Sequence, residues 1–162
     1  KVNNGLLKEV ESINRLRPQR IIAKLKSSMK NLENKKIAVW GLAFKPNTDD
    51  VRNAPSLEVV SRLIEEKATV NCHDPQATNQ FKKVFNRKVN INFFDDMYES
   101  VGECDALIIL TEWPEYLKAN LDQLKTKMGT PLIIDGRGIF KLDEVQKSGF
   151  EYKAFGLTEN NN

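Results

Sequence analysis

The fold of this chain follows from residues 37–56, IAVWGLAFKPNTDDVRNAPS, in which an apolar strand runs through one glycine into a polar, charged loop. In α/β proteins, ligands bind at strand ends of this kind. The loop carries Lys45 at its start and Arg52 near its end. Pro55 follows, and proline fits the first position of a helix. We therefore interpret the loop as a candidate binding site and not as a simple connection.

Beyond residue 35, short apolar runs alternate with patterns of helical period. Predicted strands cover residues 37–40, 69–73, 91–94, 106–110, 132–134 and 152–155, and predicted helices cover residues 56–66, 77–85, 97–101, 121–128 and 142–147. Strands that alternate with helices favour a mainly parallel sheet with helices on both faces. The sequence therefore predicts a Rossmann-like, three-layer α/β domain.

A long amphipathic helix is predicted over residues 2–30, and Pro18 should kink or interrupt it. Its apolar stripe needs a partner, either this domain, a preceding domain or a second chain; we favour a domain or dimer interface. We assign residues 1–34 to a connecting helix, residues 35–157 to the Rossmann-like domain and residues 158–162 to a frayed tail. The chain starts without Met inside a helical pattern, which suggests a longer protein.

The composition is typical of a soluble globular protein, with 162 residues, 40% hydrophobic and 29% charged. No apolar run approaches the roughly 18 residues of a membrane span. The net charge is only +3 and the charges are interspersed, which disfavours nucleic acid as a partner. Cys72 and Cys104 form no CxxC pair, so we expect buried thiols in a reducing, cytoplasmic setting, with no disulfide and no metal site.

The first strand lacks the glycine fingerprint of a dinucleotide site. The GxGxxG positions hold Gly41, Ala43 and Pro46, and the loop is too long for a tight phosphate turn. We therefore expect no NAD bound in the usual way by this domain. Asp74, after the second predicted strand, stands where an acid could bind a ribose, but Asp before Pro75 favours a helix cap.

Three cations at strand ends suit an anionic ligand. Lys45 and Arg52 would face a phosphate or carboxylate, or would instead pair with Asp49 and Asp50 to hold the loop; the residue types leave both readings open. Arg137 follows another apolar strand among glycines and would point toward the first loop, or would pair with Asp135 in a tight turn; the sequence is GRG after that acid.

The remaining polar and aromatic candidates receive less weight. His73 is the only histidine and has no carboxylate or serine partner in a recognisable spacing, so we expect no catalytic role for it. Trp113 and Tyr116 could stack on a base, but we expect them to cover the core.

Four motifs occur together along the chain: GLAFKPNTDDVRNAPS, HDP, DALIILTEW and IIDGRGIF. In order and spacing they resemble the C-terminal, UDP-binding domain of the UDP-glucose/GDP-mannose dehydrogenase family, over about residues 1–157. The combination of TDDVR, TEW and DGR is most similar to that of the UDP-glucose 6-dehydrogenases.

The resemblance implies a larger enzyme with an N-terminal NAD-binding domain, a central dimerisation region and this domain over the UDP-sugar. Such an enzyme oxidises UDP-glucose to UDP-glucuronate with two NAD, through a cysteine-linked intermediate, and is a homodimer. Carried over by position, Phe44, Lys45 and Arg137 would contact the UDP-sugar. Arg52 would approach NAD bound on the other domain.

The chain also departs from the family pattern, because nothing in it matches the GxGGxCxxKD segment that carries the nucleophile. Cys72 and Cys104 have no neighbouring base to favour a thiolate. We therefore expect no catalytic residue in this chain and no activity from it alone. The alternatives are a dehydrogenase for another nucleotide sugar, a non-catalytic nucleotide-sugar sensor, and an interaction domain that dimerises through its first helix.

Overall fold

The computed structural model describes residues 4–86 and 89–155, with side chains from residue 16 onward. The strands are β1 (Lys36–Trp40), β2 (Thr69–His73), β3 (Ile91–Phe94), β4 (Ala106–Ile109), β5 (Leu132–Asp135) and β6 (Glu151–Ala154). The helices are α1 (Asn4–Ser28), α2 (Pro55–Glu65), α3 (Thr78–Val84), α4 (Met97–Ser100), α5 (Pro114–Leu117), α6 (Leu121–Lys127) and α7 (Leu142–Lys147). The tail predicted over residues 158–162 lies outside the described residues.

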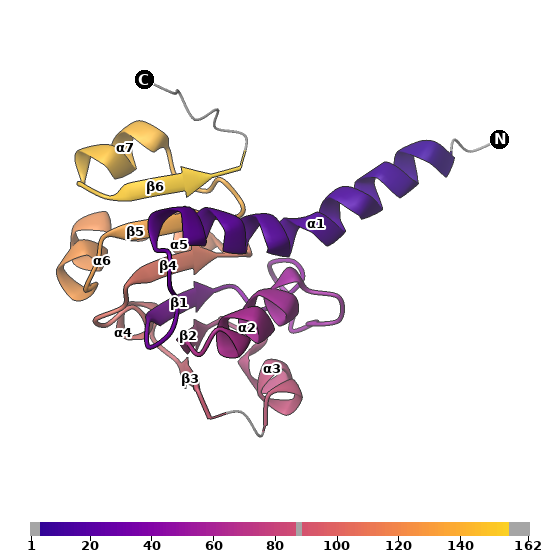
Figure 1. The fold of residues 1–162 in the computed structure, drawn as a ribbon, viewed down its shortest axis with the longest axis horizontal. Helices are drawn as coiled ribbons and strands as arrows, with labels where there is room; N and C mark the ends of the chain where they lie inside the picture. Colours follow the sequence, from indigo (N-terminus) through magenta and orange to yellow (C-terminus); the bar gives the residue numbers. More distant parts are fainter. Residues whose placement is uncertain (1–3, 87–88, 156–162) are drawn as a thin grey trace.

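The strands form one sheet in the order β3-β2-β1-β4-β5-β6, and every described pair of neighbours is parallel (Figure 1). This order confirms the predicted Rossmann-like class, and the sheet is fully parallel where we expected a mainly parallel one. The chain winds outward from β1 in one direction and then returns to wind outward from β4. The order therefore reverses between β1 and β4, which is where sheets of this class bind ligands.

Helices cover both faces of the sheet. Right-handed crossovers place α2 and α3 on one face, and α4 and α6, which contact each other, on the other. Helix α1 packs against α2 (Figure 1). The four residues of β4 and the four of β5 are all buried, as expected for strands covered on both sides.

Each strand and helix predicted beyond residue 35 is present, with ends that differ by one residue at most. One helix, α5, was not predicted, because four residues are too few to show a period. Its only signal is Pro114 at the first turn. Pro55 begins α2, as predicted.

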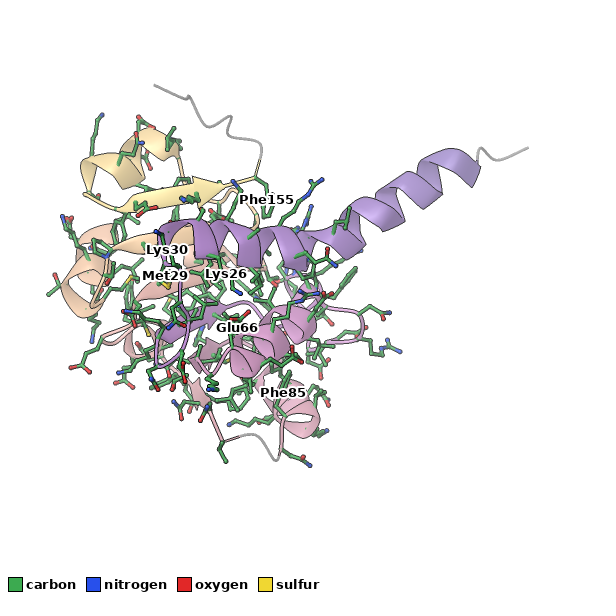
Figure 2. All side chains as sticks on the ribbon, viewed as in Figure 1. Lys26, Met29, Lys30, Glu66, Phe85 and Phe155 are labelled. Atoms are coloured by element: carbon green, nitrogen blue, oxygen red, sulfur yellow. The ribbon has the colours of Figure 1, made fainter. Side chains whose placement is uncertain are left out.

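Helix α1 continues through Pro18 without a break, so of the two expected effects the interruption is wrong; Figure 1 shows the helix bent along its length, in agreement with the expected kink. A proline removes one backbone donor and crowds the preceding turn, which bends a helix whose two halves are otherwise supported. The C-terminal part buries Ile21 and Leu25 completely. Lys26 pairs with Glu66 just beyond α2 (Figure 2). This part of α1 therefore belongs to the domain's own helical layer.

No helix among the described residues is both long enough and apolar enough to cross a membrane.

Candidate functional site

Gly41 directly follows β1 at the point where the strand order reverses, and it has a φ of 88°. A Cβ added there would lie 2.6 Å from both the Cβ and the backbone nitrogen of Thr111, which follows β4. Only glycine tolerates both the backbone conformation and this approach. The Thr111 hydroxyl also donates a 2.6 Å hydrogen bond to the carbonyl of Ala43. The two strand ends are thus joined directly, with no space between them.

The loop after β1 has a fixed base. The N–H of Phe44 donates to the carbonyl of Asp50 at 2.9 Å, which closes the loop at its neck. The hydroxyl of Ser56 donates to the carbonyl of Leu42 at 2.6 Å. Asn47 has a φ of 63°, a left-handed conformation that asparagine adopts more readily than most residues. The loop therefore has a defined conformation held by hydrogen bonds at its base.

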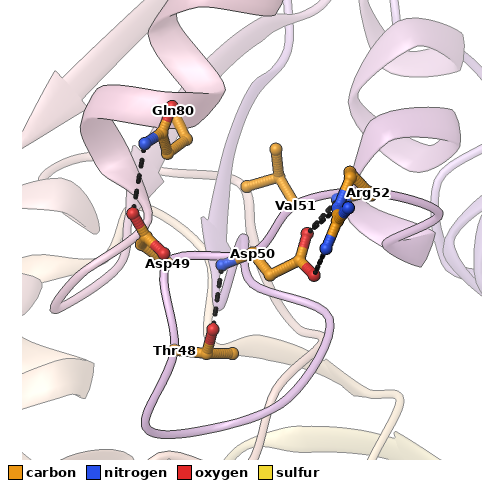
Figure 3. A pocket seen from close by; sticks show the side chains of 6 residues that line it. All are labelled: Thr48, Asp49, Asp50, Val51, Arg52 and Gln80. Atoms are coloured by element: carbon orange, nitrogen blue, oxygen red, sulfur yellow. Dashed lines mark hydrogen bonds and ion pairs between the residues drawn. The ribbon is translucent and has the colours of Figure 1, made fainter.

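Within this loop Arg52 pairs with Asp50. Its Nε and Nη2 donate to the two carboxylate oxygens at 2.9 and 2.8 Å (Figure 3). The side-chain hydrogen bond from Arg52, followed by a backbone one, lowers the pKa of Asp50 to about 2. The Arg52 side chain is nevertheless 85% exposed. Arg52 therefore pairs with an acid of its own loop, which was one of the two alternatives. Its side chain is still exposed enough to contact a ligand that is bound to another domain.

A hollow of about 430 Å³ lies between this loop and α3. Asp49 reaches across it, because its carboxylate accepts a 3.1 Å hydrogen bond from the Nε2 of Gln80 (Figure 3). The residues that line the hollow are Thr48, Asp49, Asp50, Val51, Arg52 and Gln80.

Phe44 and Lys45 stand on the outer side of the loop. Phe44 is 44% exposed, which is unusual for a large aromatic side chain. The Lys45 ammonium lies 5.8 Å from the centre of the Phe44 ring, within cation–π range. The ion pairs found among the described side chains do not include Lys45. The pairing alternative therefore does not apply to Lys45, which presents a positive charge beside an exposed ring.

Asp74 occupies the crevice that a dinucleotide would use. One carboxylate oxygen accepts from the backbone N–H groups of Leu42 and Ala43, at 2.7 and 3.0 Å, and from the indole of Trp113 at 3.1 Å. The other accepts from the N–H groups of Gln76 and Ala77 at 2.9 and 2.7 Å, in the turn before α3. Asp74 therefore binds the turn that leads into α3 and is not the N-cap of the helix, which is Ala77. A ribose finds no free carboxylate oxygen here.

This arrangement also bears on the missing glycine fingerprint. In a dinucleotide fold, N–H groups after the first strand approach the pyrophosphate. Here Leu42 and Ala43 donate to a buried carboxylate of the chain itself. The residues present at this crevice do not fit a dinucleotide.

The aromatic residues after β4 cover the core, as expected. Trp113 is 3% exposed and Tyr116 is fully buried, stacked 4.8 Å from Trp40. His73 is buried too, and its Nδ1 lies 2.8 Å from the Tyr116 hydroxyl. Burial lowers the pKa of His73, so the ring is neutral at physiological pH and serves the packing of this region.

Arg137 pairs with Glu112 and not with Asp135. Its Nη2 donates to the Glu112 carboxylate in the loop after β4. Asp135 is fully buried and accepts from backbone N–H groups of the turn, including those of Arg137 and Gly138, and from the hydroxyl of Tyr152 at 2.8 Å. The predicted tight turn around Asp135 is therefore confirmed for the backbone. The predicted pairing of the Arg137 guanidinium with Asp135 is wrong.

Cys72 and Cys104 are buried and free, as predicted. Burial raises the pKa of the Cys104 thiol to about 12 and that of Cys72 further. Neither is poised as a nucleophile. Among the described residues there is also no group of three His, Cys, Asp or Glu side chains that could hold a metal ion.

The family model for the UDP-binding domain of the UDP-glucose/GDP-mannose dehydrogenase family matches residues 38–142, which contain both loops. The chain belongs to this family. It contributes the family's C-terminal UDP-binding domain, which the motifs at residues 41–56 and 135–138 predicted.

Curated relatives of the family support this membership. The chain is 37% identical over 151 residues to a UDP-glucose 6-dehydrogenase of Bacillus subtilis, covering 93% of this chain and 32% of the relative. It is 42% identical over 126 residues to a UDP-glucose 6-dehydrogenase of Rhizobium meliloti, covering 78% and 28%. The chain thus spans about a third of the length of these relatives.

Solved structures of UDP-sugar dehydrogenases share the fold. A UDP-glucose dehydrogenase from Pyrobaculum islandicum aligns with a TM-score of 0.74 at 28% identity, over 90% of this chain and 31% of that one. A UDP-D-ManNAc dehydrogenase from Pyrococcus horikoshii aligns with the same TM-score at 29% identity, over 93% and 33%. The fold of this domain is therefore common to proteins named for different sugars.

Sequence reasoning missed the residues that hold the site together. Glu112, Thr111 and Ser56 all lie inside the motifs at residues 105–113 and 41–56, but nothing in the sequence indicated the groups that each would bind. The one available signal was the repeated position of polar residues just after parallel strands, where Thr111, Glu112 and Asp74 all lie.

Proposed function

We propose that this chain is the UDP-sugar-binding part of a UDP-glucose 6-dehydrogenase that oxidises UDP-glucose to UDP-glucuronate with two NAD. The observation that carries the proposal is the exposed pair Phe44 and Lys45 on a fixed loop of a UDP-binding family domain. In this proposal residues 1–34 are the end of a connecting region whose last turns pack on this domain, and the cytoplasmic enzyme is a homodimer.

The substrate-binding roles follow from the chemistry of the side chains. Lys45 supplies a mobile positive charge for a diphosphate, and Phe44 supplies an apolar face beside it. Arg137 offers a planar guanidinium from the second strand-end turn. Both regions belong to the strand-end edge of the sheet, which is the side where α/β domains bind ligands.

NAD enters the proposal as a molecule held mainly outside this chain. Asp74 closes the domain's own crevice, so Arg52 is the residue that would meet the cofactor. Its bonds to Asp50 orient the guanidinium while the side chain stays exposed, which suits contact with a phosphate on a neighbouring domain. NAD would accept the hydride, and the chain alone would be inactive because it carries no activated thiol.

The test uses the complete enzyme that contains this domain. Lys45→Ala and Arg137→Ala should each weaken UDP binding by roughly ten- to hundredfold, the range for a charge-assisted hydrogen bond. Isothermal titration calorimetry measures the Kd. Lys141→Ala and Arg62→Ala are the matched controls, because both residues form ion pairs elsewhere on the surface. Unchanged UDP affinity in both site variants would remove the site assignment.

A second candidate is a dehydrogenase for a UDP-N-acetyl sugar, because the chain aligns as well with the UDP-D-ManNAc dehydrogenase as with the UDP-glucose dehydrogenase. NADH formation from a panel of nucleotide sugars, with NAD and with NADP, separates the two. Activity with UDP-glucose alone supports the first candidate, and activity confined to an N-acetyl sugar supports the second. No NADH from any sugar would favour a non-catalytic nucleotide-sugar sensor.

A further inference from the structure

Glu112 is a charged residue that none of the roles above uses, yet it lies at the centre of the strand-end edge. It lies three residues after the end of β4, in the loop that leads to α5. Its carboxylate accepts a hydrogen bond from the guanidinium of Arg137, which belongs to the turn after β5. The pair therefore links the ends of two neighbouring strands.

The residues on either side of Glu112 bind the first loop. The Thr111 hydroxyl donates to the carbonyl of Ala43, directly before Phe44. The indole of Trp113 donates to Asp74, the same carboxylate that holds the N–H groups of Leu42 and Ala43. Residues 111–113 thus connect the base of the Phe44 and Lys45 loop with Arg137. A shift of the first loop or of the turn that carries Arg137 would therefore also move Glu112.

A second guanidinium approaches the same carboxylate from α1. Arg17 is close enough to Glu112 and Arg137 to affect, and be affected by, their charges. One negative charge therefore lies among two positive ones, and the cluster keeps a net positive charge. Glu112 therefore holds the guanidinium of Arg137 without neutralising the edge, which suits the diphosphate of a nucleotide sugar.

The geometry of Glu112 is not that of a pair built for stability. Its second carboxylate oxygen is buried, and no described group donates a hydrogen bond to it. An acceptor buried without a donor is costly. Both side chains of the pair are also partly open to solvent, 28% exposed for Arg137 and 37% for Glu112, where ion pairs contribute little to stability.

We infer that Glu112 is a positioning residue that fixes the guanidinium of Arg137 for the UDP moiety and ties its place to that of the Phe44 and Lys45 loop. This inference rests on the proposed function, because it needs Arg137 to contact the nucleotide sugar. Glu112 itself acts through Arg137 and not on the substrate.

The test is a double-variant cycle in the complete enzyme, read by the Kd for UDP. Glu112→Gln, which keeps the shape and removes the charge, should raise the Kd roughly three- to tenfold, as expected for residues that share a network. In an Arg137→Ala background the same substitution should change nothing further. Glu112→Asp keeps the charge and should recover part of the affinity.

Thermal unfolding separates positioning from a structural role. Glu144→Gln is the matched control, since it removes another partly exposed carboxylate from an ion pair, with Lys141. Glu112→Gln and Glu144→Gln should shift the unfolding temperature equally little, while only Glu112→Gln weakens UDP binding. A lower unfolding temperature with unchanged Kd would show a structural role and overturn the inference.

The other outcomes are distinct. If Arg137→Ala raises the Kd and Glu112→Gln does not, the inference fails and the proposed site stands. If Glu112→Gln raises the Kd equally with and without Arg137, Glu112 contacts the ligand itself and the inference fails. If Arg137→Ala leaves the Kd unchanged, Arg137 is not part of the proposed site and this inference fails. The result for Lys45→Ala then decides whether the proposed site itself stands.

Discussion

The carboxylate of Asp74 lies 2.7 Å from the backbone nitrogen of Leu42 and accepts its hydrogen. The two residues come from the ends of β1 and β2, at the edge where a related fold would bind a dinucleotide phosphate. The chain thus supplies its own anion to the N–H groups of its first loop. This contact both closes the domain's crevice and fixes the base of the loop that we propose for UDP.

Replacement of Asp74 by Asn should destabilise the domain by about 2–4 kcal/mol, because buried donors would lose their acceptors. Every hydrogen bond that the Asp74 carboxylate accepts from a described residue comes from an N–H donor. In either orientation of the new amide, its NH₂ group would face N–H donors and could not accept their hydrogens. Urea unfolding of the chain measures the loss. Asp122→Asn, at an exposed position of α6, should stay within about 0.5 kcal/mol. Equal stability of the two variants would contradict the prediction.

Replacement of Gly41 by Ala should cost about 2–5 kcal/mol, because a positive φ and a steric overlap combine. The new Cβ would lie 2.6 Å from atoms of Thr111, one of which belongs to the backbone. Gly138 is the matched control. It has a φ of 67° but no atom within 4 Å of an added Cβ, so Gly138→Ala should show the conformational cost alone, about 1–2 kcal/mol. Chemical denaturation of both variants gives the difference, and a Gly41 cost no larger than that of Gly138 would disprove the overlap.

The fold could be predicted from the sequence because its signals are local. Apolar runs of strand length alternate with helical periods, and the order of strands then follows from right-handed crossovers. The sequence predicted a kink or an interruption at Pro18 but could not decide between them, because the continuity of the helix depends on the core contacts of Ile21 and Leu25 from the second half of α1. Helix α5 escaped prediction because a single turn has no period.

The site was predicted in its location and only partly in its contacts. The loop at residues 41–52 and the turn at Arg137 stand out because charge follows an apolar strand. Their partners do not. Asp50 was one of two acids available to Arg52, and Glu112 is 25 residues from Arg137 in the sequence. Only the register of β4 and β5 brings that pair together, and neither the TEW nor the DGR motif indicates this register.

The pairing of Asp50 with Arg52 should persist into strongly acidic solution. The pKa of Asp50 in the folded chain is about 2, below the value of about 3.9 for a free side chain. The stabilisation of the loop by this pair is therefore complete above about pH 4 and is lost as the pH falls toward 2. A carbon-13 NMR titration of the Asp50 carboxyl should have its midpoint near 2. In Arg52→Gln the midpoint should rise toward the ordinary value, and an unchanged midpoint would show that Arg52 is not the cause.

Neither cysteine should react with a thiol reagent while the chain is folded. Both are buried, and burial raises the pKa of Cys104 to about 12 and that of Cys72 further. At pH 8 a thiol with a pKa near 12 is ionised in about one molecule in 10⁴, and the thiolate is the reactive form. Dithionitrobenzoate should therefore label no cysteine in the native chain and both in guanidinium chloride. Rapid labelling of either thiol in the native chain would reveal an accessible thiolate. It would contradict our proposal that the catalytic nucleophile is neither Cys72 nor Cys104.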